Sequence, residues 1–175
     1  MKNLFSIEGK TALVTGGSRG IGEMIAAGFL ANGAKVYISS RKAETCDATA
    51  KRLQEEYGGE CISLPADLSN LEGIESLVGQ LSDTSLDILV NNAGASWGEP
   101  IDEYSEKGWD KVMDTNVKGV FFLTQKLLPL LRSSGTAEDP SRVINIGSID
   151  GIKTGLFDAF SYGPSKFFLF RSYLD

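Results

Sequence analysis

The sequence alternates between short runs of β-branched and apolar residues and longer stretches in which apolar residues recur at helical spacing. The short runs predict strands, and the longer stretches predict helices. The predicted strands span residues 11–15, 34–39, 61–64, 86–90 and 142–146, and the predicted helices span 21–32, 43–57, 70–81 and 106–131, with a last helix beginning near Tyr162. Strands that are apolar throughout and separated by helices are typical of a parallel sheet covered on both faces. We therefore expect an α/β fold of the Rossmann type, with a doubly wound parallel sheet.

Length and charge narrow the class further. A chain of 175 residues is expected to form one domain, residues 1–175. Its 17 basic and 23 acidic side chains give a net charge of −6, which argues against a nucleic-acid partner. No run approaches the roughly 20 apolar residues of a membrane span, and the first ten residues lack the apolar core of a signal peptide. We expect no membrane partner and a cytoplasmic location.

The residue types that are missing also limit the chemistry. The chain has no histidine, so acid–base chemistry would depend on Tyr, Lys, Asp, Glu or Cys, and most zinc sites are excluded. The two cysteines, Cys46 and Cys61, do not form a CxxC pair. We expect them to be packing residues, and we expect no metal site.

A glycine cluster follows the first predicted strand and precedes the first predicted helix. Gly16, Gly20 and Gly22 are spaced as GxxxGxG within the run TGGSRGIG at 15–22. Glycines at this place let the backbone approach a pyrophosphate, and the helix N-terminus adds the positive end of its dipole. A plain tight turn is the alternative. The position after the first strand of a βαβ unit favours the phosphate-binding interpretation.

The second predicted strand ends in Ser39, Ser40, Arg41 and Lys42. An acidic residue at this place would bind a ribose 2′-hydroxyl and repel a 2′-phosphate, but none is present. Two hydroxyls and two cations, with Arg19 as a third, favour NADP over NAD. The alternative is that the cations belong to a solvated helix start.

Polar residues also follow the third and fourth predicted strands. Asp67 follows the third, where it could recognise an adenine amine or serve as the N-cap of the next helix. The fourth strand leads into the run NNAG at 91–94, where ligands bind at the carboxyl ends of an open sheet. Side-chain bonds from two asparagines could hold the strand end open. An Asn-rich turn is the alternative.

The residues with the clearest catalytic pattern are Ser148, Tyr162 and Lys166. Tyr162 and Lys166 are four residues apart and would share one face of a helix. A free tyrosine hydroxyl titrates near pH 10, and an ammonium group close to it favours the phenolate. Ser148, 14 residues earlier at a strand end, could donate to a substrate oxygen.

Together these residues resemble the short-chain dehydrogenase/reductase family. The resemblance rests on TGGSRGIG at 15–22, DLS at 67–69, NNAG at 91–94, Asn116, Ser148 and YGPSK at 162–166. Within the family, the NADPH-dependent β-ketoacyl reductases of rhamnolipid synthesis are most similar. The resemblance implies that Tyr162 is the general acid in carbonyl reduction and that Lys166 binds the nicotinamide ribose and makes Tyr162 more acidic. It also implies that Ser148 orients the carbonyl and that Asn116 holds a water linking Lys166 to solvent.

The same resemblance implies an NADP(H) site and a small carbonyl or alcohol substrate. The cofactor-binding residues that it implies come from the glycine loop and from the ends of three strands, together with the two catalytic residues of the last helix. These residues are Gly16, Ser18, Arg19, Gly20, Ile21, Gly22, Ser40, Arg41, Asp67, Leu68, Asn92, Ala93, Gly94, Tyr162 and Lys166. Members of the family commonly form homo-oligomers.

The chain departs from the family pattern after Lys166. Nine residues follow, whereas the family continues through two further βα units, so we expect a truncated domain that lacks the last strands. Three functions remain open. The first is an NADP-dependent oxidoreductase, the second is an inactive nucleotide-binding form, and the third is an unstable product in which the strand at 142–146 is an unpaired edge. Because the truncation would remove much of the helix pair that commonly forms the dimer in this family, we do not expect this chain to form the homo-oligomer.

Overall fold

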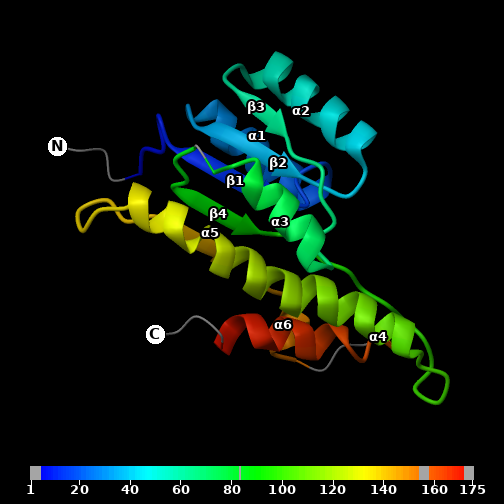
Figure 1. The fold of residues 1–175 in the computed structure, drawn as a ribbon. Helices are drawn as coiled ribbons and strands as arrows, with labels where there is room; N and C mark the ends of the chain where they lie inside the picture. Colours follow the sequence, from blue (N-terminus) through cyan, green and yellow to red (C-terminus); the bar gives the residue numbers. More distant parts are fainter. Residues whose placement is uncertain (1–4, 83, 154–157, 172–175) are drawn as a thin grey trace.

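The computed structural model describes residues 5–82, 84–153 and 158–171, with side chains up to residue 168. It contains a five-stranded sheet in the order β3-β2-β1-β4-β5 (Figure 1). The strands are β1 (Thr11–Thr15), β2 (Lys35–Ser39), β3 (Cys61–Ser63), β4 (Ile88–Asn91) and β5 (Arg142–Asn145). All four neighbouring pairs are parallel. The predicted doubly wound parallel sheet is confirmed, with the order reversing between β1 and β4.

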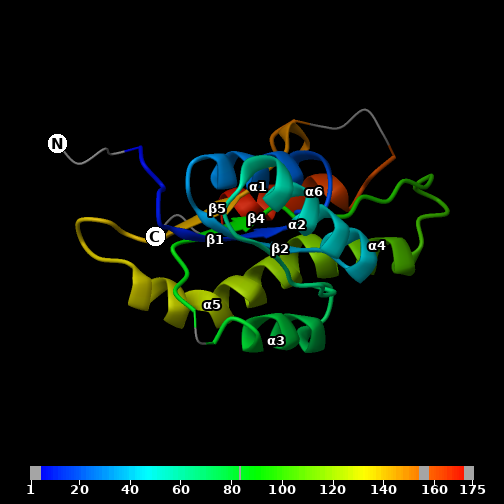
Figure 2. The ribbon, with the colours of Figure 1, turned by 90° about the horizontal axis from the view of Figure 1, so that it is seen from above.

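Helices cover both faces of this sheet (Figure 2). The helices α1 (Gly20–Ala31) and α2 (Ala43–Tyr57) lie on one face, and α3 (Leu71–Gly79) and α5 (Val120–Ser134) lie on the other. The helix α4 (Glu106–Met113) leads into α5 through residues 114–119, and α6 (Tyr162–Arg171) packs against α4 and residues 114–119. Each face has its own apolar core. One core packs Val14, Ile38 and Val90 against α1 and α2, and the second packs Leu13 and Leu89 against α3 and α5. The strands are buried on both sides, which explains their continuous apolar sequence.

The long helix predicted at 106–131 is divided. A π-helical segment, η1 (Asp114–Gly119), separates α4 from α5. Asn116 lies in this segment and its side chain bonds to Ala95 on a neighbouring loop. Gly119 packs so closely on the carbonyl of Leu68 that a side chain there would clash. Single π-turns of this kind often mark functional sites. Apolar periodicity alone did not reveal the interruption.

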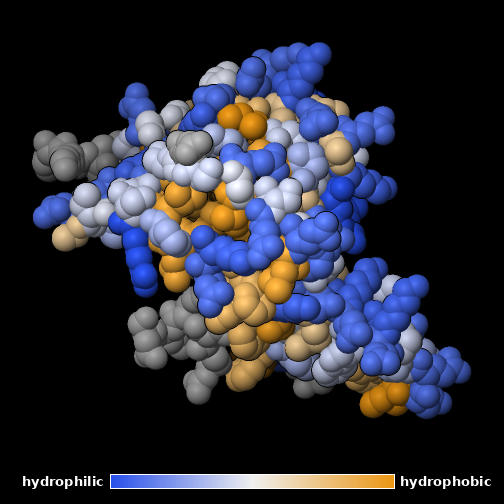
Figure 3. Space-filling view, viewed as in Figure 1, coloured by the Kyte–Doolittle hydropathy of each residue, from blue (hydrophilic) through white to orange (hydrophobic). Residues whose placement is uncertain are grey.

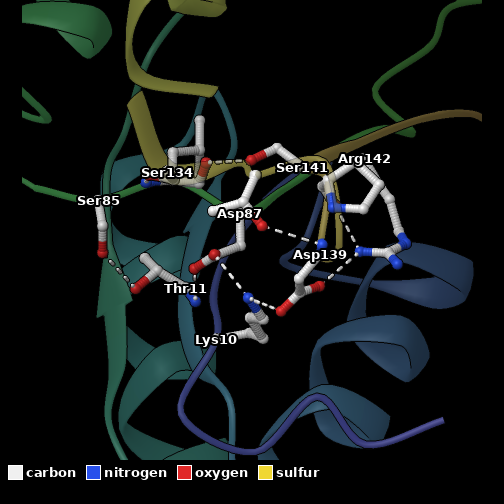
Figure 4. Close-up of polar contacts among 11 residues, drawn as sticks. Lys10, Thr11, Ser85, Asp87, Ser134, Asp139, Ser141 and Arg142 are labelled. Carbon is white, nitrogen blue, oxygen red and sulfur yellow. Dashed lines mark hydrogen bonds and ion pairs between the residues drawn. The ribbon is translucent and has the colours of Figure 1, made fainter. Parts of the chain in front are cut away.

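Polar side chains join the amino ends of β1, β4 and β5 (Figure 4). The carboxylate of Asp87 accepts a hydrogen bond from the Thr11 N–H at 2.8 Å and from Lys10 Nζ at 3.1 Å. Lys10 also pairs with Asp139 at 2.8 Å. The backbone carbonyl of Asp87 accepts from the N–H of Arg142, which begins β5. We call these five residues the amino-edge clamp, because they connect three strands at the edge opposite the glycine loop.

The surface is mostly hydrophilic, but apolar residues gather along the middle of the face that carries α3 and α5 (Figure 3). Leu71 and Phe121 belong to these helices and are 40% and 41% exposed. Val143 and Ile144 are also partly exposed, and β5 pairs with no strand besides β4 in the described part of the chain. Within the same residues, no helix is both long and apolar enough to cross a membrane.

Candidate active site

A cavity of about 520 Å³ lies at the carboxyl ends of the strands, where the sheet order reverses between β1 and β4. Ligands of open α/β sheets bind at such switch points. We call it the glycine-loop cavity. Its walls come from the glycine loop, from the ends of β2, β3 and β4, and from the π-helical segment. They are formed by Gly16, Ser18, Arg19, Ser39, Ser40, Arg41, Lys42, Thr45, Ala66, Asp67, Leu68, Asn92, Ala93, Gly94, Ala95 and Thr115.

The glycine loop is shaped by two close backbone approaches. Gly16 has φ +64°, and a Cβ there would lie 2.8 Å from the Asn92 amide nitrogen. A side chain at Gly22 would collide with the Gly16 carbonyl. Gly20, Ile21 and Gly22, which were predicted to bind cofactor, do not line the cavity. Gly22 instead lets α1 begin directly against the loop.

Asn92 and Thr15 connect the loop to the end of β4. The Asn92 amide donates to the carbonyls of Thr15 at 2.9 Å and Gly16 at 3.3 Å. The Thr15 hydroxyl accepts from the N–H groups of Asn92 and Ala93 and donates to the Val90 carbonyl. The predicted role of these asparagines in holding the strand end open is therefore seen for Asn92. Asn91 bonds instead to Thr124 and Asn145 in the sheet interior.

The end of β2 carries two serine hydroxyls and two cationic side chains that face the glycine-loop cavity. Ser39 Oγ and Ser40 Oγ are buried, and within the described residues neither has a hydrogen-bond partner. Among the same residues, no carboxylate forms an ion pair with Arg19, Arg41 or Lys42. Buried polar groups are normally satisfied, so these two hydroxyls, which lie in the cavity wall, are available to a polar ligand. The three cations are exposed and lie around the same cavity, which makes its opening electropositive.

Asp67 lies in the cavity wall and does not cap a helix. The N-cap of α3 is Asn70, whose side chain accepts from the Gly73 N–H at 2.8 Å. Asp67 accepts from the backbone and hydroxyl of Ser69, at 3.0 and 2.8 Å. The N-cap alternative for Asp67 is wrong. Its position is compatible with the predicted contact to an adenine amine.

Lys166 and Tyr162 lie on α6, as their spacing predicts. Lys166 is only 5% exposed, and its Nζ donates to the Ile146 carbonyl at 2.9 Å. The same atom lies 5.7 Å from the centre of the Tyr162 ring. Burial lowers the pKa of Lys166. An ideal Cβ on Gly94 would lie 3.7 Å from this nitrogen, so the ammonium group lies next to a wall residue of the glycine-loop cavity.

Asn116 is almost fully buried and holds two segments of the site together. Its amide nitrogen donates to the Ala95 carbonyl at 2.9 Å and to Ser165 Oγ at 3.0 Å. Its amide oxygen accepts from the Ala95 N–H at 2.8 Å. Ser165 in turn donates to the Tyr162 carbonyl at 2.7 Å. Asn116 therefore connects the loop after β4 to the helix that carries Tyr162 and Lys166.

Tyr162 lines a second cavity of about 820 Å³, which we call the α6 cavity. Asp150 and Gly151 also line it and belong to the short helix η2 (Ile149–Gly151). Ser148 caps this helix, because its Oγ accepts the Asp150 N–H at 3.3 Å. That bond uses the oxygen as an acceptor, and among the described residues no group accepts the Ser148 O–H proton. The remaining walls are Ser96, Gly98, Ile152, Lys153, Ala159, Phe160, Gly163, Pro164 and Phe167.

Sequence reasoning missed several residues of both cavities. Thr45, Ala95 and Thr115 line the glycine-loop cavity, and Tyr104 supports the α6 cavity. The Tyr104 hydroxyl lies 2.6 Å from Ser161 Oγ, next to Tyr162 in the chain. Thr45 lies three residues beyond Lys42, so the helical period could have placed it at the same end of α2. Tyr104 gave no signal, because its partner is 57 residues away.

Comparison with known proteins identifies the family of this chain. Residues 10–171 match the model of the short chain dehydrogenase family. The chain belongs to this family. It is 54% identical over 168 residues to the rhamnolipids biosynthesis 3-oxoacyl-[acyl-carrier-protein] reductase of Pseudomonas aeruginosa, covering 95% of this chain and 65% of that protein.

Two solved structures of the family are similar to this chain. The Pseudomonas aeruginosa RhlG/NADP active-site complex matches with a TM-score of 0.91 and 54% identity, over 97% of this chain and 66% of that one. L-Sorbose reductase from Gluconobacter frateurii, complexed with NADPH and L-sorbose, matches with a TM-score of 0.86 and 30% identity, over 94% of this chain and 61% of that one. This short-chain dehydrogenase thus spans just under two thirds of the length of these relatives.

Proposed function

We propose that this chain binds NADP(H) and reduces a carbonyl group to an alcohol. The observation that carries the proposal is the position of Lys166, whose buried ammonium group lies between Gly94, a wall residue of the glycine-loop cavity, and Tyr162, a wall residue of the α6 cavity. A buried charge costs folding free energy, and such groups are concentrated at functional sites. Two cavities suit a reaction between a cofactor and a second molecule.

The glycine-loop cavity fits NADP(H). The buried hydroxyls of Ser39 and Ser40, which have no partner among the described residues, and the cations of Arg19 and Arg41 suit the extra phosphate that distinguishes NADP from NAD. The residues that would hold the cofactor are Gly16, Ser18, Arg19, Ser40, Arg41, Asp67, Leu68, Asn92, Ala93 and Gly94. Gly20, Ile21 and Gly22 would contribute through the shape of the loop. When bound, NADPH supplies the hydride that reduces the carbonyl carbon.

The side chains of this protein would supply the proton that the carbonyl oxygen takes up. The Tyr162 hydroxyl donates a proton to the carbonyl oxygen as that oxygen gains negative charge. The Lys166 ammonium, 5.7 Å from the ring centre, stabilises the phenolate that remains. The free O–H of Ser148 donates a hydrogen bond to the same oxygen and orients it. Asn116 keeps the loop after β4 against α6, so that Tyr162 and Lys166 face the site together.

The substrate class that we favour is a 3-oxoacyl thioester. The similar Pseudomonas aeruginosa protein carries the name of a 3-oxoacyl-[acyl-carrier-protein] reductase. Ile152, Phe160 and Phe167 line the α6 cavity and would give an acyl chain an apolar surface. A cytoplasmic location is part of this proposal, because NADPH-dependent reductases of this kind act on intracellular metabolites.

The test combines cofactor binding with turnover. We expect NADPH to bind with a change in fluorescence, and a 3-oxoacyl thioester to be reduced with oxidation of NADPH. Tyr162→Phe keeps the ring beside Lys166 and removes the hydroxyl, so turnover should fall by about 10²- to 10⁴-fold while binding persists. Turnover that is equal in both proteins would refute the role of Tyr162.

A nucleotide-binding protein without turnover is the second candidate. It is favoured by the exposure of Ile149 and Ile152, 67% and 72%, beside Ser148 on the substrate side. NADPH binding with no reduction of any 3-oxoacyl thioester or small ketone would support it. Absence of NADPH binding would contradict both candidates.

A further inference from the structure

Thr49 of α2 lies outside both cavities but is bonded to the glycine loop. Its Oγ1 donates to the Ser18 carbonyl at 3.1 Å, and the side chain is almost fully buried, at 6% exposure. The other buried residues of α2 are Cys46, Ala50 and Leu53. Thr49 is thus a polar residue on an otherwise apolar inner face, and its hydroxyl is satisfied by the loop. A buried hydroxyl is tolerated when it has such a partner.

The bond to Ser18 fixes the peptide that joins Ser18 to Arg19. Because a trans peptide is planar, its C=O and N–H point in opposite directions. A carbonyl held toward α2 therefore directs the Arg19 N–H away from α2. Both Ser18 and Arg19 line the glycine-loop cavity. Thr49 consequently orients this one peptide, next to Gly17, whose N–H donates to the Ser39 carbonyl at 3.1 Å.

The same helix carries the opposite wall of the cavity. Arg41 and Lys42 precede its first residue, and Thr45 lies in its first turn. An ion pair between Arg52 and Glu23 of α1, at 2.7 Å, holds the two helices together one turn beyond Thr49. The Thr49 bond thus connects the helix that follows Arg41 and Lys42 to the loop that carries Arg19.

We propose that Thr49 is a positioning residue that sets selectivity for NADP(H) over NAD(H). It holds Ser18 and Arg19 at the separation from Arg41 and Lys42 that a 2′-phosphate requires. This inference rests on the proposed function and extends it to a residue that contacts no ligand. A cofactor without the 2′-phosphate does not need this separation, so the effect of losing the bond should be selective.

The test measures binding and does not depend on turnover. Thr49→Val preserves the shape of the side chain and removes the donor, and Thr49→Ser keeps the donor. Isothermal titration would give the affinities of wild type and both variants for NADPH, NADH and adenosine 2′,5′-bisphosphate. Thermal unfolding monitored by circular dichroism would give the folded fraction of each protein.

We expect Thr49→Val to weaken NADPH and adenosine 2′,5′-bisphosphate by about tenfold, as the loss of one well-placed hydrogen bond would. NADH affinity should change less than twofold, and Thr49→Ser should restore NADPH affinity. A lower folded fraction reduces all apparent affinities equally, so the ratio of NADPH to NADH affinity is independent of stability.

Two results would overturn this inference and leave the proposed function standing. One is unchanged NADPH affinity in Thr49→Val, and the other is an equal loss for NADPH and NADH, which would assign Thr49 a general structural role. If the wild-type chain binds none of the three probes, the proposed function fails and this inference fails with it.

Discussion

Replacing Asp87 by alanine should destabilise the fold far more than removing an exposed ion pair. Asp87 belongs to the amino-edge clamp, and its side chain is 13% exposed (Figure 4). The change leaves the Thr11 N–H without its acceptor, although Thr11 is only 7% exposed. It also removes one of the two carboxylates that pair with Lys10.

The size of the effect follows from these two contacts. A hydrogen bond from a buried N–H to a carboxylate contributes roughly 1.5–3 kcal/mol. The partly exposed pair with Lys10 adds about 0.5–1 kcal/mol, since Lys10 keeps Asp139 at 2.8 Å. We expect Asp87→Ala to lower the free energy of unfolding by about 2–4 kcal/mol. The backbone bonds of Asp87 to Thr11 and Arg142 remain, so the sheet register is kept.

Urea denaturation followed by tryptophan fluorescence would measure this change. With a slope of about 2 kcal/mol per M, the midpoint should fall by about 1–2 M. Asp87→Asn retains an acceptor for Thr11 and should cost about half as much. Glu60→Gln breaks the exposed pair of Lys35 and Glu60, at 2.9 Å, and should change stability by less than about 0.5 kcal/mol. The reasoning is refuted if Asp87→Ala costs no more than Glu60→Gln, or if Asp87→Asn costs as much as Asp87→Ala.

Two further predictions concern packing and pH. Gly108→Ala places a Cβ against the Trp97 ring and should lower the free energy of unfolding by about 1–3 kcal/mol. Gly28→Ala, in open space on α1, should leave this free energy unchanged or raise it. Equal thermal unfolding temperatures for the two variants would contradict this prediction. The ammonium of Lys10 holds the pKa of Asp139 below its ordinary range, so the unfolded state binds more protons and stability should fall as the pH drops below about 4. Asp139→Asn should reduce the slope of unfolding midpoint against pH in this range, and an unchanged slope would exclude the contribution.

Local pattern was sufficient to predict the sheet and most of the glycine-loop cavity. The buried strands are short and apolar, and their carboxyl ends meet at one edge whatever the details of packing. Ser40, Arg41, Asp67 and Asn92 therefore line one cavity, as expected from their places after the strands. The roles of the individual residues in binding and catalysis stay predictions until they are measured.

Features that depend on contacts between distant segments could not be predicted. Asp87 accepts from Thr11 across 76 residues, and nothing in the run 86–90 distinguishes this aspartate from one in a solvated turn. Asn116 lies in a stretch whose apolar spacing is that of a continuous helix, yet its bonds to Ala95 accompany a π-turn. In both cases the partner determines the structure, and the partner is not encoded nearby.

Thr49 shows why contacts between distant segments could not be predicted from the sequence. Residues 43–57 have the polar composition of a surface helix, and a threonine in such a helix predicts nothing specific. Its contact with Ser18 arises because α1 and α2 lie side by side and are tied by Glu23 and Arg52. A hydroxyl facing inward at this crossing has to find a partner, and the Ser18 carbonyl provides it. This bond orients part of the glycine loop, although Thr49 itself does not line the glycine-loop cavity. On our inference, selectivity for NADP(H) over NAD(H) therefore depends on the packing of α1 and α2 as well as on the residues in the cavity wall.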